Sequence, residues 1–472
     1  MDDAKAAEFS LKVMINKEKT KVLFVEADNH FADILLSFLT LPLGRIIKVL
    51  EKHYGDEAPT IGSLSSLYHS LVNLEVGPYF VTEGAKQTLL NPASTFEAEY
   101  ARLKIDYNDY HPAKYFTCGI LLCRRIRRVS MYHDNNANIC PNCRNIRKLQ
   151  SNLWHDGKKL KDASGDGVFT MNTSSFIISD DLQILPYKTG LLGIISILGI
   201  TDVDKAEPIK VTFGFSEIMS LLKASLISQA PFSDLILSKA RHVNSVAVGS
   251  EPETSLNQIK NEDNTDSKKI VLKVMVQKSC GKLLYAQAEE DFVEFLFSLF
   301  NIPLGGAEHL LAGKTCIKAI DNLYRSTAVV IDDKYFKAPD TINRLTKPNV
   351  VHGCISDDNI LLLTEECLPD DYSDMSWSSS DKFPNGKGSY LKIPQTYHVA
   401  DDLTVTPLCI FSILSSLKKQ EIPISDVKEV ELQIGLKEGL NILKASLTST
   451  TALTDALLDI VRIKHKIINF RG

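Results

Sequence analysis

The stretch of sequence that decides the fold occurs twice. Residues 10–50 read SLKVMINKEKTKVLFVEADNHFADILLSFLTLPLGRIIKVL, and residues 271–311 read VLKVMVQKSCGKLLYAQAEEDFVEFLFSLFNIPLGGAEHLL. The two stretches share 15 identities over 41 positions without a gap, including the run Leu-Lys-Val-Met and the triplet Pro-Leu-Gly. An internal repeat of this length indicates that the chain contains two copies of one structural unit.

Matching blocks continue beyond these stretches in the same order. The pair Asp180-Asp181 recurs as Asp401-Asp402, and the pentapeptide Leu-Lys-Ala-Ser-Leu begins at both Leu222 and Leu443. The offset between matching residues falls from 256 before this region to 221 within it, so the first copy holds about 35 additional residues between positions 92 and 180. The two units are therefore related but unequal in content.

The repeated stretch begins as a β-hairpin followed by a helix. Apolar residues at positions 11, 13 and 15 alternate with polar or less buried types, which is typical of a half-buried strand. Residues 17–20 predict a tight turn, and residues 21–26 a second strand. Asp28 or Asn29 is a suitable N-cap for the helix that follows, and Pro42 and Gly44 are expected to end or kink it.

Each copy ends with another strand and an amphipathic helix. The strands are expected at residues 209–215 and 430–434, each directly before the helix that contains Leu-Lys-Ala-Ser-Leu. Because an isolated hairpin is only marginally stable, we expect the hairpin and the late strand to share one sheet, with helices packed on one face. The predicted fold class is α+β, as two tandem units. A Skp1/BTB-like fold, which also starts with a hairpin and helices, is a competing interpretation.

These patterns divide the chain into four parts. We predict a first unit at residues 9–244, with a Cys-rich insertion at about 115–150, and a second unit at residues 270–461. Residues 245–269 are polar and lack aromatic side chains, so they are expected to form a flexible linker. Residues 462–472 are expected to form a C-terminal tail.

The overall composition restricts the function only loosely. The chain has 472 residues with 53 basic and 58 acidic side chains, a formal charge of −5, which disfavours a protein that coats nucleic acid over its whole surface. The N-terminus lacks the features of a secretory or organelle signal. The longest uncharged run, residues 403–417, is shorter than a membrane span. We therefore expect a cytoplasmic or nuclear protein without a transmembrane segment.

Four of the nine cysteines lie close together in the insertion, with the spacing of metal ligands: Cys118, Cys123, Cys140 and Cys143. Two pairs of thiolates joined by a loop can complete a tetrahedral zinc site, and four thiolates leave no open position for catalysis. The predicted cofactor is therefore one structural Zn²⁺. His133 could replace one thiolate. The alternative is four unrelated reduced thiols.

The same segment is strongly basic. Positions 118 to 148 contain one acidic residue, Asp134, and seven basic residues, which are Arg124, Arg125, Arg127, Arg128, Arg144, Arg147 and Lys148. A zinc knuckle with this charge could contact nucleic acid phosphates, with Tyr132 available for stacking. The alternative, which we favour, is a solvated basic face that offsets the negative charge of the thiolates.

No catalytic motif is recognised. Residues 312–315, Ala-Gly-Lys-Thr, resemble the end of a phosphate-binding loop, but position 308 is Glu where that loop requires Gly. A glycine that ends a helix, followed by a solvent-facing lysine, explains this segment better. We therefore assign no catalytic residue.

The chain resembles a plant-specific family of duplicated proteins of unknown function. The resemblance rests on LKVMINKEKTKVLFVEAD, on the LPLG signature, on TEGAKQTLLNP, and on the YFTC and CPNC elements of the insertion. It implies cysteine pairs at this place in the chain, often with Cys-x-Cys-Gly as the second pair, whereas Cys140-Pro-Asn-Cys143 differs from that form. It implies no activity, substrate or cofactor.

Three functional hypotheses follow. The first is a non-enzymatic binding, scaffold or regulatory protein with one structural zinc and unidentified protein partners. The second is a nucleic-acid-binding module that uses the Arg-rich knuckle. The third is an enzyme with an unrecognised site between the two copies, because ligand sites are common at domain interfaces.

Overall fold

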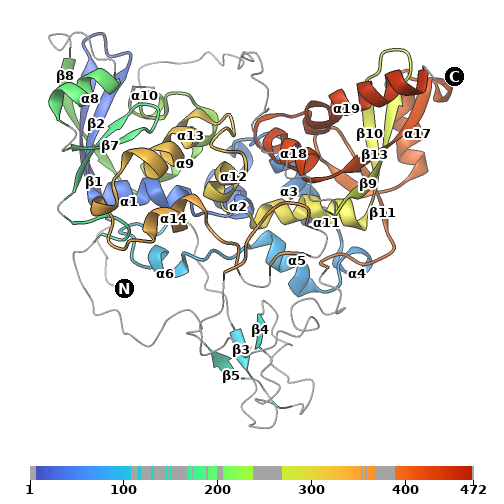
Figure 1. Cartoon of the computed structure of the whole chain (residues 1–472), viewed down its shortest axis with the longest axis horizontal. Coiled ribbons are helices and arrows are strands. Elements are labelled where there is room, and N and C mark those ends of the chain that lie inside the picture. Colours follow the sequence, from blue (N-terminus) through green and yellow to red (C-terminus); the bar gives the residue numbers. More distant parts are fainter. Residues whose placement is uncertain are drawn as a thin grey trace.

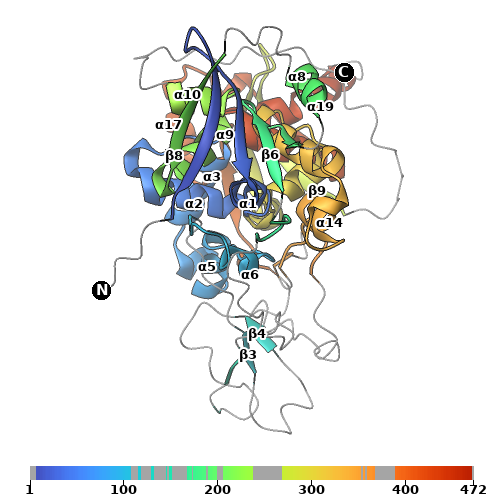
Figure 2. The ribbon, with the colours of Figure 1, turned by 90° about the vertical axis from the view of Figure 1, so that its left-hand side faces the viewer.

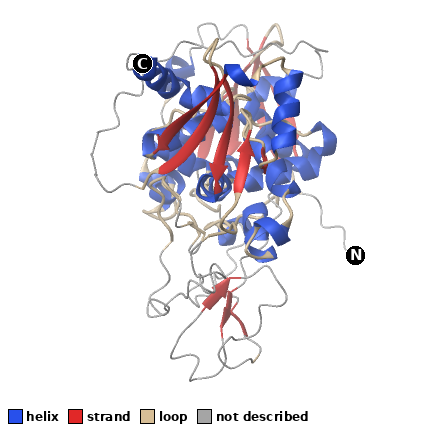
Figure 3. Cartoon of the chain, turned by 90° about the vertical axis from the view of Figure 1, so that its right-hand side faces the viewer, coloured by secondary structure: helices blue, strands red, loops and turns tan. Residues whose placement is uncertain are grey.

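The structure is a computed structural model in which two five-stranded antiparallel sheets enclose a large set of helices. It describes residues 7–107, 115–117, 129–131, 145, 148–150, 167–172, 174–187, 190–198, 206–237, 268–351, 354–356, 359–366 and 389–469. The sheets lie at opposite ends of the molecule, and most of the helices fill the space between them (Figures 1, 2 and 3). The α+β class predicted from the sequence is confirmed.

The first half of the chain supplies one of these sheets and a third, smaller one. Its strands are β1 (Phe9–Asn16), β2 (Val22–Asp28), β3 (Tyr115–Thr117), β4 (Val129–Met131), β5 (Lys148–Gln150), β6 (Ser175–Ser179), β7 (Ile184–Pro186) and β8 (Ala206–Phe213). Its helices are α1 (Asn29–Phe38), α2 (Leu43–Tyr54), η1 (Gly55–Glu57), α3 (Leu64–Asn73), α4 (Val76–Tyr79), α5 (Glu83–Leu90), α6 (Glu97–Tyr100), α8 (Leu191–Leu198), α9 (Phe215–Ile227) and α10 (Pro231–Leu237).

The second half supplies the other five-stranded sheet. Its strands are β9 (Ile270–Gln277), β10 (Leu283–Glu289), β11 (Thr396–Val399), β12 (Val405–Pro407) and β13 (Val427–Ile434). Its helices are α11 (Glu290–Ser298), η6 (Leu299–Asn301), α12 (Leu304–Leu310), α13 (Lys318–Arg325), η7 (Ser326–Val330), η8 (Asp333–Tyr335), α14 (Thr341–Thr346), α17 (Ile410–Lys419), η9 (Ile424–Asp426), α18 (Leu436–Thr448) and α19 (Ala452–Asn469).

The two large sheets have the same topology. Their strand orders are β7-β6-β2-β1-β8 and β12-β11-β10-β9-β13, so every strand of one sheet has a counterpart in the other. Both hairpins carry an irregularity at the same place, between Met14 and Ile15 in one and between Leu283 and Tyr285 in the other. The hairpin and the late strand share one sheet in each half, as the sequence predicted, and the late strand pairs with the first strand of the hairpin.

The local signals of the hairpin and helix are largely confirmed. Residues of β1 alternate between buried and more exposed, and the Asp28 side chain accepts a hydrogen bond from the Phe31 amide at 2.9 Å, which makes it the N-cap of α1. Pro42 is the N-cap of α2. The late strand of the first half differs from the prediction: it ends at Phe213 because Gly214 begins α9, where Glu217 accepts a hydrogen bond from the Gly214 amide.

Helices of each half cross over to the sheet of the other half. In Figure 1 the gold helices α13 and α14 of the second half lie beside the first sheet, whereas the blue helix α3 lies toward the second. The Ser70 hydroxyl of α3 accepts a hydrogen bond from the Val405 amide of β12 at 2.9 Å. At the corresponding place, Ser326 Oγ accepts from the Ile184 amide of β7, also at 2.9 Å. The two halves therefore interlock.

The Pro-Leu-Gly triplets of the two halves pair directly with each other. The Leu43 amide donates to the Ile302 carbonyl, and the Leu304 amide donates to the Leu41 carbonyl, both at 2.9 Å. These bonds connect equivalent residues in reciprocal directions. A Cβ atom at Gly305 would lie 3.0 Å from the Leu39 carbonyl oxygen of the first half, so this glycine allows the close approach of the halves.

Two further backbone exchanges connect the halves in the same reciprocal way. Phe80 forms an isolated bridge with Leu391, and Phe336 forms one with Thr170. Buried apolar residues of both halves belong to one continuous cluster. Within it the rings of Phe80 and Phe297 are stacked with their centroids 6.4 Å apart. The core is thus shared between the halves and is not divided into two.

The first half also contains a small separate sheet within the predicted insertion. Its strand order is β4-β3-β5, and it lies below the two large sheets in Figure 1. No helix among the described residues is long and apolar enough to cross a membrane. Helix α19 continues to Asn469, beyond position 462, where the tail was expected to begin.

Candidate functional site

The residues that the sequence singled out for zinc and nucleic acid lie mostly outside the described part of the chain. This applies to Cys118, Cys123, Cys140, Cys143 and His133, and to all six arginines, Arg124, Arg125, Arg127, Arg128, Arg144 and Arg147. Lys148 is the first residue of β5. Within the described ranges, no group of three or more His, Cys, Asp or Glu side chains is arranged to hold a metal ion. The zinc site stays a prediction.

The backbone around the predicted zinc site is described at three places. Thr117, the last residue of β3, lies opposite Val129 of β4 and also opposite Lys148 of β5. The connection from β3 to β4 ends at Val129, and the connection from β4 to β5 ends at Lys148, so both end beside Thr117. Cys118 is the next residue in the chain.

The segment at residues 312–315 serves the fold, as the sequence indicated. Gly313 has a φ of 71°, and its amide donates to the Glu308 carbonyl at 2.8 Å just after α12 ends. The Thr315 hydroxyl lies 2.7 Å from both Glu308 Oε1 and Asp321 Oδ1. Burial and the neighbouring Asp321 raise the pKa of Glu308 to about 9, so this carboxyl is protonated at neutral pH and can share hydrogen bonds with Thr315.

A pocket of about 280 Å³ lies where the two halves meet, and many of the side chains that line it are polar. The first half contributes Thr95 and Phe96. The second half contributes Gly306, His309, Leu310, Asp340, Asn343, Arg344, Lys347, Pro348, Asn349, Leu362, Leu363, Thr364 and Glu366. The pocket is close in volume to the smaller sites that bind small molecules in proteins.

Arg344 fixes the wall of the pocket between the halves. Its Nη1 atom lies 2.7 Å from Glu99 Oε1, and its guanidinium carbon lies 4.6 Å from the centre of the Phe96 ring. The guanidinium therefore forms an ion pair and a cation–π contact with the first half at the same time.

Two titratable groups of the pocket have shifted pKa values. Burial raises the pKa of Glu366 to about 7; Arg344 partly opposes this shift, and Glu99 adds to it. Burial and the nearby Lys347 lower the pKa of His309. Near neutral pH the Glu366 carboxyl is thus present in both protonation states and can donate or accept a hydrogen bond.

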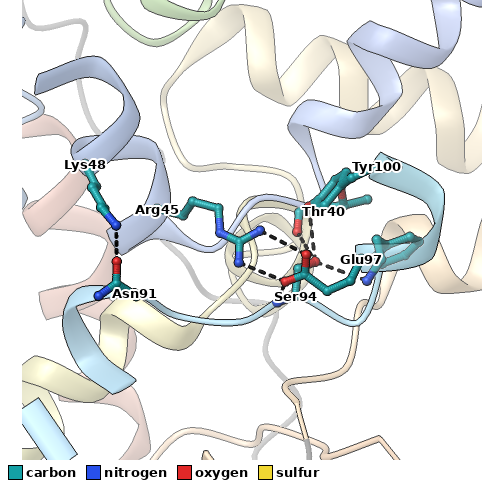
Figure 4. A network of polar contacts seen from close by, with 8 residues as sticks. Thr40, Arg45, Lys48, Asn91, Ser94, Glu97 and Tyr100 are labelled. Atoms are coloured by element: carbon teal, nitrogen blue, oxygen red, sulfur yellow. Dashed lines mark hydrogen bonds and ion pairs between the residues drawn. The ribbon is translucent and has the colours of Figure 1, made fainter. Parts of the chain in front are cut away.

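The corresponding place in the first half is filled by a polar network (Figure 4). Arg45 forms two hydrogen bonds with Glu97, at 2.8 and 3.4 Å, and its side chain is only 8% exposed. The Tyr100 hydroxyl lies 2.8 Å from Thr40 Oγ1 and 3.1 Å from Ser94 Oγ. Lys48 donates to Asn91 beside it. The polar groups of this network therefore satisfy one another.

Sequence reasoning placed a possible site between the copies but could not name its residues. The lining residues come from four separate segments, at 95–96, 306–310, 340–349 and 362–366. No motif connects these segments. The one signal in the sequence is the difference between the repeats at the position after Pro-Leu-Gly, where the first copy has Arg45 and the second has Gly306.

Comparison with known proteins identifies a family without an assigned function. Residues 5–437 match the model of a family described as protein of unknown function, DUF674. No curated protein and no solved structure matches the chain. The family match spans nearly the whole of both halves.

Proposed function

The chain belongs to the DUF674 family, and from this premise we propose that it is a non-enzymatic binding protein in which the two interlocked halves form a scaffold for the Cys-rich insertion. In this proposal one Zn²⁺ ion, held by Cys118, Cys123, Cys140 and Cys143, stabilises the insertion. The insertion and the body together then present a surface to a protein partner.

The observation that carries the zinc proposal is the register of the small sheet. Because Thr117 lies opposite both Val129 and Lys148, Cys118 directly follows the point where both loops end. Cys143 precedes Lys148 by only five residues. A connection of this length allows Cys143 and Cys118 to reach the same metal ion. The register thus supports a site in which the two cysteine pairs meet at one end of the sheet.

The use of two buried carboxylates, Glu294 and Asp180, and of the half-buried Asp401 supports a binding role over a catalytic one. Glu294 accepts hydrogen bonds from the Tyr390 and Leu391 amides at 2.7 and 3.0 Å. Asp180 accepts from both the amide and the hydroxyl of Ser233, and Asp401 makes the same pair of contacts with Thr454. These acids are occupied in holding backbone segments in place.

Zinc analysis of the purified full chain tests the metal proposal. We expect one equivalent of zinc per chain, lost in the double variant Cys140→Ser, Cys143→Ser. Cys409→Ser, which changes an exposed free thiol before α17, is the matched control and should keep the metal. Less than half an equivalent of zinc in the unaltered protein, with all four insertion thiols reacting freely under native conditions, would contradict the proposal.

Affinity purification of the tagged full chain tests the binding role. If the partner is a protein, the same protein should co-purify in a fixed ratio to the chain with and without nuclease treatment. Co-purifying molecules that are lost after nuclease treatment would instead favour nucleic acid as the bound partner.

Binding of nucleic acid is the second candidate, favoured by the same register. Arg128 and Arg147 directly precede Val129 and Lys148, so two basic residues are connected to the end of the sheet where Cys118 follows. If this candidate is correct, single-stranded RNA should bind with a strong salt dependence that falls when Arg124, Arg125, Arg127 and Arg128 are changed to Ala. The matched control is Lys418→Ala with Lys419→Ala, two lysines at the end of α17.

A further inference from the structure

The pocket between the halves lies at a position of the repeat where the first copy has an arginine and the second has a glycine. Arg45 and Gly306 hold the same position in the repeat, directly after the paired Leu-Gly residues at the start of α2 and α12. In the first half the Arg45 side chain is buried and bound to Glu97. In the second half position 306 has no side chain, and Gly306 is one wall of the cavity.

Three polar side chains that face this cavity have no hydrogen bond or ion pair with any described residue. They are His309, Lys347 and Glu366. Other lining residues are occupied: Arg344 pairs with Glu99, Asp340 accepts from Asn343, and Thr364 donates to Asn349. The first half satisfies its polar groups at this place internally, so these three side chains are a feature of the second half alone.

The kinds of unpartnered group indicate the chemistry of a ligand. Lys347 carries a positive charge, and the His309 ring can donate a hydrogen bond, so together they suit a carboxylate or phosphate. Glu366 is an acceptor for a hydroxyl when ionised and a donor when protonated. Phe96 and Leu310 provide apolar walls on which a short carbon skeleton can lie. The small volume excludes a nucleotide or another large cofactor.

We propose that the pocket beside Gly306 binds a small hydroxylated anion, with its carboxylate or phosphate held by Lys347 and His309 and its hydroxyl by Glu366. Arg344 positions the wall of this site through Glu99 and Phe96. The proposal is independent of zinc and of the insertion, since none of the lining residues belongs to residues 108–166.

Ligand-observed NMR titration of the full chain tests the proposal with four probes. Glycerate and glycerol 3-phosphate carry both groups, glycerol lacks the anion, and propanoate lacks the hydroxyl. We expect the first two to bind with saturation and the last two to bind about tenfold more weakly or not at all, the difference expected for one lost charged contact. The preference between glycerate and glycerol 3-phosphate identifies which anion the site takes.

Three variants locate the binding. Gly306→Leu should abolish binding of both hydroxylated anions by filling the pocket. A Cβ atom at position 306 makes only ordinary contacts, the nearest at 3.4 Å from an Ile302 methyl group, so the first carbon of the new side chain fits. The thermal unfolding temperature of this variant is measured beside its binding. Lys347→Ala should weaken binding about five- to tenfold, consistent with the loss of one partly exposed ionic contact. Lys418→Ala on α17, far from the pocket, should leave binding unchanged.

Two results would overturn the proposal. One is the absence of saturation for both hydroxylated anions up to about 20 mM, a concentration at which even a weak specific site fills. The other is saturation that persists in Gly306→Leu, because binding would then occur elsewhere on the protein. A Gly306→Leu protein that melts normally and fails to bind supports the site and excludes misfolding as the cause.

Discussion

The two halves share one fold and differ at individual residues. Arg45 and Gly306 hold the same position in the repeat, directly after the shared Pro-Leu-Gly; the arginine belongs to a filled polar network, whereas the glycine lines a cavity. The repeat could be found from the sequence alone. The cavity could not, because Arg344 and Glu366 come close to Gly306 only after α14 and the following loop have folded against the first half.

Glu366 leads to a prediction about stability and pH. Its pKa is raised from the ordinary value of 4.5 to about 7, chiefly by burial. The folded chain therefore holds this proton more tightly than the unfolded chain does. The resulting stability is fully present below about pH 4.5 and is lost as the pH rises through 7. Glu366→Gln, which cannot ionise, should match the unaltered protein near pH 4 and exceed it at pH 8.

The excess free energy of unfolding at pH 8 is expected to be on the order of 2 kcal/mol, since one pKa unit corresponds to about 1.4 kcal/mol and part of the shift is screened by solvent. Denaturant unfolding at pH 4 and pH 8 measures it. Glu57→Gln, at an exposed acid of η1, is the matched control for the loss of one carboxylate. If the difference in free energy of unfolding between Glu366→Gln and the unaltered protein is equal at both pH values, the raised pKa of Glu366 is refuted.

At the scale of elements, the hairpins and the late strands were predictable from the sequence, whereas the other strands and the exchange of helices were not. Alternation located β1, and the turn residues located the hairpin, because side-chain period and turn chemistry are local properties. The spacing of apolar residues also identifies one buried face of α3. It does not say which sheet that face meets, and α3 packs toward β12 of the other half. Tertiary contacts alone decide this choice.

Because each half places a helical serine against a strand of the other half, we expect similar losses of stability from substitutions at these two serines. Ser70→Ala removes the acceptor for the Val405 amide, and Ser326→Ala removes the acceptor for the Ile184 amide. Each leaves a buried strand amide without a partner and should lower the free energy of unfolding by about 1–2 kcal/mol. Because the two bonds lie in different sheets, the double variant should show the sum of the two losses to within about 0.5 kcal/mol.

Ser66→Ala provides the control for this pair of variants. Ser66 lies one turn before Ser70 on α3, and the contact it makes with Ser70 uses its backbone carbonyl, which the substitution keeps. Its stability should match that of the unaltered protein or exceed it slightly, since Ala favours a helix. Equal stability of all four proteins in chemical denaturation would show that the crossed hydrogen bonds do not hold the halves together.

At the scale of the whole molecule, the halves depend on each other for their cores. Phe80 of the first half stacks on Phe297 of the second, and the Pro-Leu-Gly segments exchange two backbone hydrogen bonds. The sequence predicted two units joined by a polar linker at residues 245–269, of which all but the last two residues lie outside the described ranges. The strength of association between the units could not be read from the repeat, because a repeat reports common ancestry of the units and not their packing.

Cleavage of the linker therefore should not separate the halves. A protease site inserted after Ser250 allows a single cut in the folded protein. Since the core is continuous across the halves, the two fragments should elute together at the size of the intact chain and unfold in one transition. Cutting makes the association bimolecular, so the melting temperature should fall and become dependent on concentration, whereas that of the uncut protein with the same insertion should not. Fragments that separate under native conditions, each with its own transition, would mean that each sheet folds without the helices it receives from the other half.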